Sequence, residues 1–229
     1  MTVLENSMFF GVTLTLCAYA IGAWLKKKFK LAIFNPLLIS IILIIIFLAV
    51  SGMDYDTYNE GAEFVSYLLT PATVCLAVPM YDQMEALKKN AYAIIAGILS
   101  GTVTSMICVL ACSLIFHFNH ETYVTLLPKS ITTAIGIGVT EEMGGVATIT
   151  IAAIIITGIL GNIIAEFVCK IFRIKHPVAK GIAIGTASHA MGTAKAMEIG
   201  YTEGAMSSLS IAVAGVLTVV LAPIFSFLY

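Results

Sequence analysis

The segment from Ala179 to Gly200 reads AKGIAIGTASHAMGTAKAMEIG, and it interrupts a chain that is otherwise almost continuously apolar. Glycines weaken a helix here, and polar side chains near the centre would need hydrogen-bonding partners in hydrocarbon. The residues concerned are Gly181, Gly185, Gly192, Gly200, Thr186, Ser188, His189 and Thr193. A polar break at membrane depth is typical of a binding site. The segment therefore predicts a discontinuous membrane helix.

The composition of the chain is that of an integral membrane protein. Hydrophobic residues make up 59% of its 229 residues and charged residues 11%, whereas soluble domains carry about 25% charged residues. At about 20 residues per span, we predict one all-α transmembrane domain over residues 1–229, with about seven crossings and one re-entrant or short polar element. The net charge of −1 gives no reason to expect nucleic acid. Five cysteines without ligand spacing indicate neither a metal nor a cofactor.

Eight apolar or semi-apolar elements follow one another along the chain. They run over residues 8–25, 31–50, 63–87, 91–116, 123–139, 146–169, 178–198 and 204–229. The third contains Thr70-Pro71-Ala72-Thr73, and because proline removes a backbone donor we predict a second break there. The fifth is short and polar, which is unusual for a crossing.

Loop charge predicts the orientation of these elements. The segments 26–30, 88–89 and 170–180 hold ten of the twelve Lys and Arg residues, so we assign them to the cytoplasm. The loops 51–61 and 117–121 lack Lys and Arg, and we assign them to the outside. The N-terminus is then outside and the C-terminus inside. If the fifth element enters and leaves on one side, residues 31–116 and 146–229 form an inverted repeat.

Paired discontinuous helices in inverted repeats are a recurring plan of secondary transporters. We therefore predict that Thr70 and Thr73 meet the polar centre of the seventh element, Thr186, Ser188, His189, Gly192 and Thr193, in one substrate site. The histidine is suited to bind a carboxylate or a coupling proton, and its alternative role is a neutral ring bonded to a backbone carbonyl. The hydroxyls are suited to bind the substrate, or else their own helix backbone. Gly192 either admits an anion to the backbone or packs against a neighbouring helix.

The fifth element adds a cation to this site. Lys129, Ser130, Thr132 and Thr133 follow Pro128, where a half-helix would begin with free N–H groups that favour an anion. The alternative is that Lys129 only anchors the chain at the membrane interface.

The sequences LLPKSITTAIGI, EEMGG and KGIAIGTASHAMGTAKAMEIG followed by GAMSSLSI resemble the LrgB/CidB family, with the nearer match to CidB. The resemblance covers nearly the whole chain. It implies a bacterial cytoplasmic membrane protein with a small LrgA/CidA-type membrane partner, in a homo- or hetero-oligomer. It also implies transport of small 2-oxo or 2-hydroxy monocarboxylates, because a plastid relative translocates glycolate and glycerate and some bacterial relatives are linked to pyruvate transport.

The residues carry no enzyme signature: Ser188 and His189 are adjacent, so on one helix they point about 100° apart, and no phosphate-binding GxxxxGK[ST] loop exists. We therefore predict a secondary carrier working by alternating access, driven by a gradient or by a coupled proton or Na⁺. The alternative is a holin-like or antiholin-like protein that changes membrane permeability, murein hydrolase activity or lysis, in which the glycines serve helix contacts.

Overall fold

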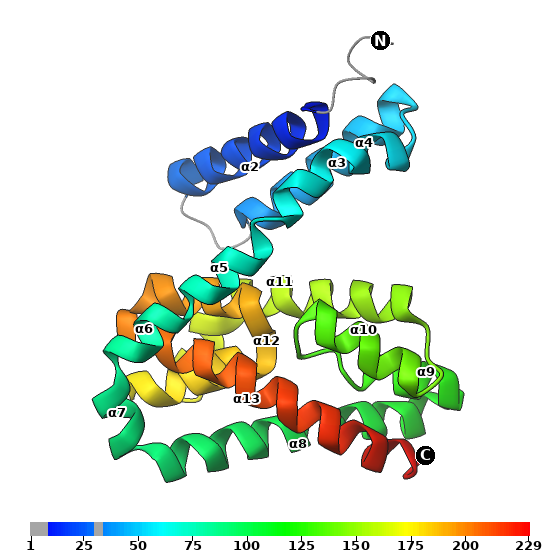
Figure 1. Ribbon diagram of the computed structural model, residues 1–229. Helices are drawn as coiled ribbons and strands as arrows, with labels where there is room; N and C mark the ends of the chain where they lie inside the picture. Colours follow the sequence, from blue (N-terminus) through cyan, green and yellow to red (C-terminus); the bar gives the residue numbers. More distant parts are fainter. Residues whose placement is uncertain (1–8, 30–33) are drawn as a thin grey trace. The chain divides into compact units, whose positions relative to one another are not determined.

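The computed structural model describes residues 9–29 and 34–229, and the elements in these ranges are all helices (Figure 1). They are α2 (Phe10–Phe29), α3 (Pro36–Ser51), α4 (Tyr55–Ser66), α5 (Leu69–Cys75), α6 (Ala77–Asp82), α7 (Met84–Lys89), α8 (Ala91–Phe116), α9 (His120–Leu126), α10 (Thr133–Glu142), α11 (Ala147–Ile171), α12 (Pro177–Ile199) and α13 (Tyr201–Ser226). In the described ranges three helices, α8, α11 and α13, are long and apolar enough to span a membrane. The all-α membrane class is confirmed, while seven crossings stay a prediction.

The chain divides into two compact units, Met1–Cys75 and Leu76–Tyr229. In the first unit, α2 lies directly against α4, because Gly11 has no side chain and approaches the backbone of Tyr58 and Gly61. Asn35 begins α3 by accepting hydrogen bonds from the N–H groups of Leu37 and Leu38, at 2.9 and 3.3 Å.

The predicted third element, 63–87, is interrupted, but not at the expected place. It is divided among α4, α5, α6 and α7, with the interruptions at residues 67–68, Leu76 and Gln83. Thr70 and Thr73 lie within α5 instead of at a break. The physical reason is the position of Pro71 in the first turn of α5, where a missing N–H removes no intrahelical bond.

In the second unit, α8 and α13 run side by side in the same direction. Ile94 and Ile98 of α8 pack in one cluster with Ala205 and Met206 of α13. Farther along both helices, Met106 and Val109 pack in a second cluster with Ala222. The unit therefore has one end where both helices begin and one end where both finish.

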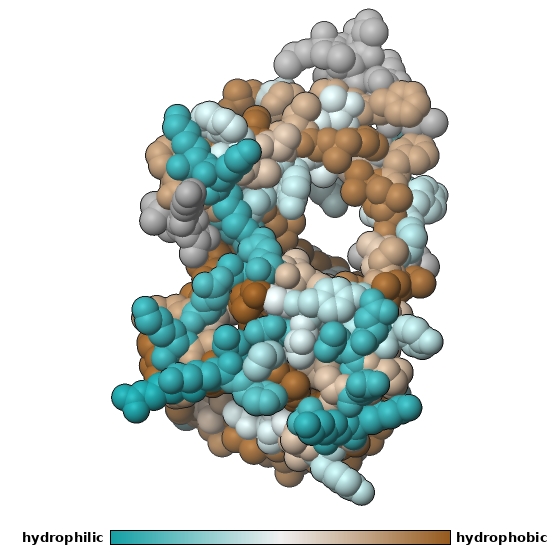
Figure 2. Space-filling view, turned by 90° about the vertical axis from the view of Figure 1, so that its left-hand side faces the viewer, coloured by the Kyte–Doolittle hydropathy of each residue, from teal (hydrophilic) through white to brown (hydrophobic). Residues whose placement is uncertain are grey.

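Basic side chains gather at the end where α8 and α13 begin, and we call it the basic end. Exposed residues there are Lys88 and Lys89 of α7 and Lys170, Arg173 and Lys175 around the α11–α12 connection. Figure 2 views the molecule from this side and shows hydrophilic residues spread over it. By the positive-inside rule we predicted that these basic segments are cytoplasmic, and that orientation stays a prediction.

The opposite end of the unit holds the C-terminus. The Tyr229 hydroxyl donates hydrogen bonds to the carbonyls of Ser113, at 3.2 Å, and Phe118. The sequence predicted that loop 117–121 is outside and the C-terminus inside. These two assignments cannot both be right, since the loop and the C-terminus lie at the same end of the unit. The reason is that α12 does not cross the unit.

Helix α12 folds back on itself at Ser188 and His189. Their backbone angles, φ −134°, ψ 16° and φ 42°, ψ −138°, are non-helical. A side chain at Gly192 would lie 3.0 Å from the Ile184 carbonyl oxygen, whereas eight residues of straight helix span about 12 Å. The break is confirmed, but the predicted discontinuous crossing is instead a re-entrant hairpin that starts and ends at the basic end.

The tip of the α12 hairpin lies at half the depth of the unit. Its first arm, residues 177–187, is about 16 Å long, roughly half of a ~30 Å hydrocarbon layer. The tip packs on the middle of α11, where Gly161 faces Ser188 and Gly158 faces His189. The absence of side chains at these two glycines lets the hairpin enter.

Helices α9 and α10 form a second hairpin, which enters from the opposite end. Tyr123 of α9 and Val139 of α10 lie in the cluster that contains Val109 and Ala222, while Ile131 between the two helices reaches Ala214. This confirms a short polar element in the fifth position, although it consists of two helices joined by residues 127–132. The two hairpin tips therefore approach each other inside the second unit.

Candidate functional site

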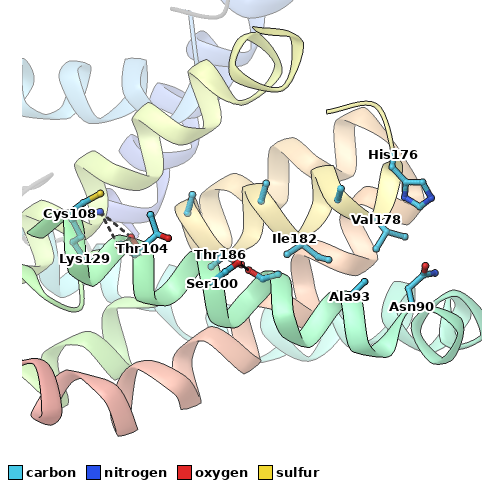
Figure 3. A pocket seen from close by; sticks show the side chains of 17 residues that line it. Asn90, Ala93, Ser100, Thr104, Cys108, Lys129, His176, Val178, Ile182 and Thr186 are labelled. Carbon is cyan, nitrogen blue, oxygen red and sulfur yellow. Dashed lines mark hydrogen bonds between the residues drawn. The ribbon is translucent and has the colours of Figure 1, made fainter. Parts of the chain in front are cut away.

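A cavity of about 630 Å³ lies between α8 and the first arm of α12. Figure 3 shows Asn90 and His176 at one end of it and Lys129 and Cys108 at the other. It is lined by Asn90, Ala93, Gly97, Ser100, Gly101, Thr104, Ser105, Cys108, Lys129, Ser130, His176, Val178, Ala179, Ile182, Ala183, Thr186 and Ala187. Since Asn90 and His176 immediately precede α8 and α12, the cavity runs from the basic end to the tip of the α9–α10 hairpin.

Small side chains make the walls of this cavity. On α8, residues Ala93, Gly97, Gly101 and Ser105 recur every four positions, so they share one face of the helix. On α12, Ala179, Ala183 and Ala187 have the same spacing and line the opposite wall. Larger side chains in these rows would fill the cavity.

Lys129 supplies the charge at the inner end. Its ammonium group donates hydrogen bonds to the hydroxyls of Ser105, at 3.3 Å, and Ser130, at 3.2 Å, and these two hydroxyls are 2.9 Å apart. Because an ammonium has three donors, one remains available to an anion in the cavity. Ion pairs in the described part of the chain involve Lys180 and Lys195, and none involves Lys129.

The depth of Lys129 gives this charge its importance. Ser105 is 11 residues before the end of α8 at Phe116 and 14 residues after its start at Ala91, about 16 and 21 Å along the helix axis. Lys129 therefore lies near the middle of the unit, where an ionisable side chain is costly and is usually functional. This position favours the site over the alternative of an anchor at the membrane interface, and the choice between the two stays a prediction.

Of the predicted site residues in the two hairpins, Lys129, Ser130 and Thr186 line the cavity. Thr132 is the N-cap of α10 and Thr133 is its first residue, so the half-helix begins at the hairpin tip as predicted, but these two residues do not line the cavity. The side chains of Thr70 and Thr73 lie outside the described part of the chain. A contribution of these two residues to the site stays a prediction.

The other predicted residues of α12 hold the hairpin together. Ser188 packs on Gly161, and Gly192 lets the two arms approach at Ser188 and Ile184. Thr193 donates to the His189 carbonyl, at 3.0 Å, and lies 2.7 Å from the Ser207 hydroxyl of α13. In this conformation they support the wall of the cavity and do not line it.

His189 is buried at the hairpin tip and bonds the tip to α11. Its Nε2 lies 3.0 Å from the Ile154 carbonyl of α11, and since a carbonyl only accepts, Nε2 carries the proton. The residue is 3% exposed and does not line the cavity. This arrangement corresponds to the alternative role of a ring bonded to a backbone carbonyl.

We expect His189→Ala to destabilise the protein more than His189→Gly. Both lose the hydrogen bond to the Ile154 carbonyl, and a typical hydrogen bond contributes about 0.5–1.5 kcal/mol. Only alanine must also adopt a positive φ, which glycine tolerates. Thermal unfolding of the two variants in detergent measures the order. In an unbroken helix glycine would instead be the worse residue by about 1 kcal/mol, so that result would contradict the hairpin tip.

Lys195 is ion-paired and not available to an anion. Its ammonium lies 2.5 Å from Glu166 of α11 and 3.3 Å from Glu198. The pair with Glu166 joins the second arm of the hairpin to α11. Lys195 therefore provides a matched comparison for Lys129, because it is a lysine of the same unit, and its ammonium group already has carboxylate partners.

The polar face of α8 is the part of the site that sequence reasoning missed. Ser100, Thr104, Ser105 and Cys108 line the cavity, but they are scattered through a helix whose average character is strongly apolar. A signal was present in the spacing of Ser100, Thr104 and Cys108, which share one helix face at intervals of four residues.

Comparisons with known proteins agree on one family. The model of the LrgB-like family matches residues 15–228. Proteins named "Antiholin-like protein LrgB" from Bacillus cereus (strain B4264) and Bacillus anthracis (strain CDC 684 / NRRL 3495) are each 38% identical over 218 residues, which cover 95% of this chain and 95% of the relative. No solved structure gives a significant match.

Proposed function

Because this chain belongs to the LrgB-like family of membrane proteins, we propose that it is a secondary carrier of small 2-oxo or 2-hydroxy monocarboxylates such as pyruvate, lactate, glycolate or glycerate. The observation that carries the proposal is Lys129, a cation without a carboxylate partner among the described residues, at the inner end of the cavity between α8 and the first arm of α12. One positive charge matches one carboxylate.

The arrangement around Lys129 supports anion binding in three ways. The Ser105 and Ser130 hydroxyls hold the ammonium in place, so little conformational freedom is lost when an anion binds. Helix α10 begins at the same hairpin tip, and its free N–H groups add partial positive charge. The small residues of the cavity wall leave space for a ligand of a few atoms.

Hairpins that enter from opposite ends support a mechanism of alternating access. In this conformation the cavity reaches Lys129 from the basic end, between α8 and α12. On the other side, α9 is closed against α11, since Thr150 donates to the Thr125 carbonyl at 2.9 Å and the Val146 N–H donates to the Thr125 hydroxyl at 2.8 Å. We propose that the two hairpins move against the long helices to close the first path and open the second. The charge distribution supports a cytoplasmic opening in the present state.

Uptake into proteoliposomes tests the proposal. We expect radiolabelled glycolate, lactate or pyruvate to accumulate with saturation, and counterflow to accelerate when the vesicles are preloaded with unlabelled substrate. Imposed proton and Na⁺ gradients identify the coupled ion. Each measurement is made with the chain alone and with a co-reconstituted LrgA/CidA-type protein, the partner that we propose. Absence of saturable uptake in both preparations would overturn the carrier.

The second candidate function is the antiholin-like one, which the names of the relatives favour. Such a protein would change membrane permeability, alone or with its partner. The same vesicles distinguish the two functions, because a permeabilising assembly releases unrelated neutral solutes of similar size without saturation, whereas a carrier retains them.

A further inference from the structure

The inner end of the cavity continues into a small recess between the hairpin tips. The recess has a volume of about 10 Å³ and shares Ser105, Ser130 and Thr186 with the cavity. Its other lining residues are Thr102, Met106, Leu127, Ile131, Ala214 and Thr218. A space of about this size holds one water-sized group and no more. The cavity therefore ends in a pocket for a single heavy atom.

Thr186 has a hydroxyl that this recess leaves without a partner. The residue is 5% exposed, and its Oγ1 is buried and accepts or donates no hydrogen bond among the described residues. Buried hydroxyls in native proteins are nearly always bonded, so an exception at a cavity indicates a group that binds there. The only other such atom in the described ranges, Ser113 Oγ, does not line the cavity.

Three of the other hydroxyls that line the recess are already engaged, those of Thr102, Ser105 and Ser130, and Thr218 is the fourth. Thr102 donates to the Ile98 carbonyl at 2.9 Å. Ser105 and Ser130 bond each other and accept from Lys129. A ligand whose carboxylate binds Lys129 would therefore find a buried hydroxyl without a partner at Thr186, which lines both the cavity and the recess.

We propose that the recess is a subsite for the oxygen on carbon 2 of the substrate, with Thr186 as the residue that recognises it. This inference rests on the proposed carrier function and adds a specificity determinant to it. A hydroxyl both donates and accepts, so Thr186 donates to a 2-oxo group and accepts from a 2-hydroxyl group. The carrier then accepts both kinds of substrate and discriminates against carboxylates that lack this oxygen, because a C–H group at carbon 2 leaves the buried hydroxyl unpaired.

Competition for uptake by matched anions tests the recess. Inhibition of labelled lactate uptake is measured with glycolate against acetate and with lactate against propionate. We expect the wild type to prefer the oxygenated member of each pair at least tenfold. Thr186→Val keeps the shape and removes the hydroxyl, and the preference should fall to about one because binding of the oxygenated member weakens. Thr186→Ser should keep most of the preference.

The outcomes separate this inference from the carrier proposal. Saturable uptake without preference in the wild type, or an unchanged preference in Thr186→Val, would overturn the recess and leave the carrier intact. Absence of saturable uptake of any carboxylate by the wild type would overturn both the carrier and the recess. Ser113→Ala, which removes a buried unpaired hydroxyl away from the cavity, is the control and should leave the preference unchanged. If Thr186→Val does not fold, the wild-type preference and Thr186→Ser still decide.

Discussion

Lys129→Met should reduce carboxylate uptake by about 100-fold. The substitution keeps most of the length of the side chain and removes the charge that faces the inner end of the cavity. A hydrogen bond to a charged group contributes about 1.5–3 kcal/mol, and each 1.4 kcal/mol changes an affinity about tenfold. The initial rate of uptake into proteoliposomes, measured over a range of substrate concentrations, gives the loss in kcat/KM.

Two comparison variants make this measurement specific. Lys195→Met removes a lysine that is paired with Glu166 and Glu198, both of them substantially exposed, so transport should change little. Lys129→Arg keeps the charge and should retain part of the activity, although its planar group does not reproduce both hydroxyl contacts. Equal loss in Lys129→Met and Lys195→Met would mean that Lys129 has no special part in binding.

The sequence predicted the break in α12 because glycines and hydroxyl groups are concentrated there. It did not predict that the helix folds back, because that depends on a surface about 30 residues away. Gly158 and Gly161 of α11 provide the space into which His189 and Ser188 pack, and no local pattern shows which helix the break will face. The error over the C-terminus has the same cause. A crossing helix and a hairpin have similar apolar content, but a crossing ends on the opposite side of the membrane and a hairpin ends on the side where it began.

The sequence placed Lys129 and Ser130 just before a helix start, and in the structure they precede α10 and line the cavity, while their part in binding stays a prediction. The sequence paired the α12 break with Thr70–Thr73, on the ground that proline breaks a helix, whereas Pro71 lies where the first turn of α5 tolerates it. The partner in the second unit is the α9–α10 connection, which reaches Thr186 at the recess.

The hairpins also suggest a repeat different from the predicted one. The first predicted half, 31–116, extends over both units and the second, 146–229, lies within the second unit, and their relation stays a prediction. Within the second unit, α8 followed by the α9–α10 hairpin and α11 followed by the α12 hairpin are each a long helix and a re-entrant hairpin, and the hairpins enter from opposite ends. We propose that residues 91–142 and 147–199 are the inverted repeat that alternates access.

A disulfide between residues 97 and 182 should stop transport completely and reversibly. A Cβ atom at Gly97 would lie 3.2 Å from Cγ2 of Ile182, so the two Cβ atoms are at most about 4.7 Å apart, close to the usual 3.5–4.5 Å for a disulfide. The bond would join α8 to the first arm of α12 across the cavity. If the hairpin must move against α8 during each cycle, oxidation of Gly97→Cys/Ile182→Cys blocks uptake and reduction restores it.

The experiment needs a background in which the five native cysteines are replaced, because Cys108 lines the same cavity. Each single cysteine variant, treated with the same oxidant, is the control and should keep its activity. Substrate binding to the oxidised protein, followed by intrinsic fluorescence or by protection from unfolding, should persist, since Lys129 and the recess are still reachable from the basic end. Unchanged uptake in a fully cross-linked sample would show that α8 and α12 do not separate during transport, and the moving parts would have to be sought elsewhere. We expect the oxidised protein to bind substrate without transporting it, because transport requires the hairpin to move and binding does not.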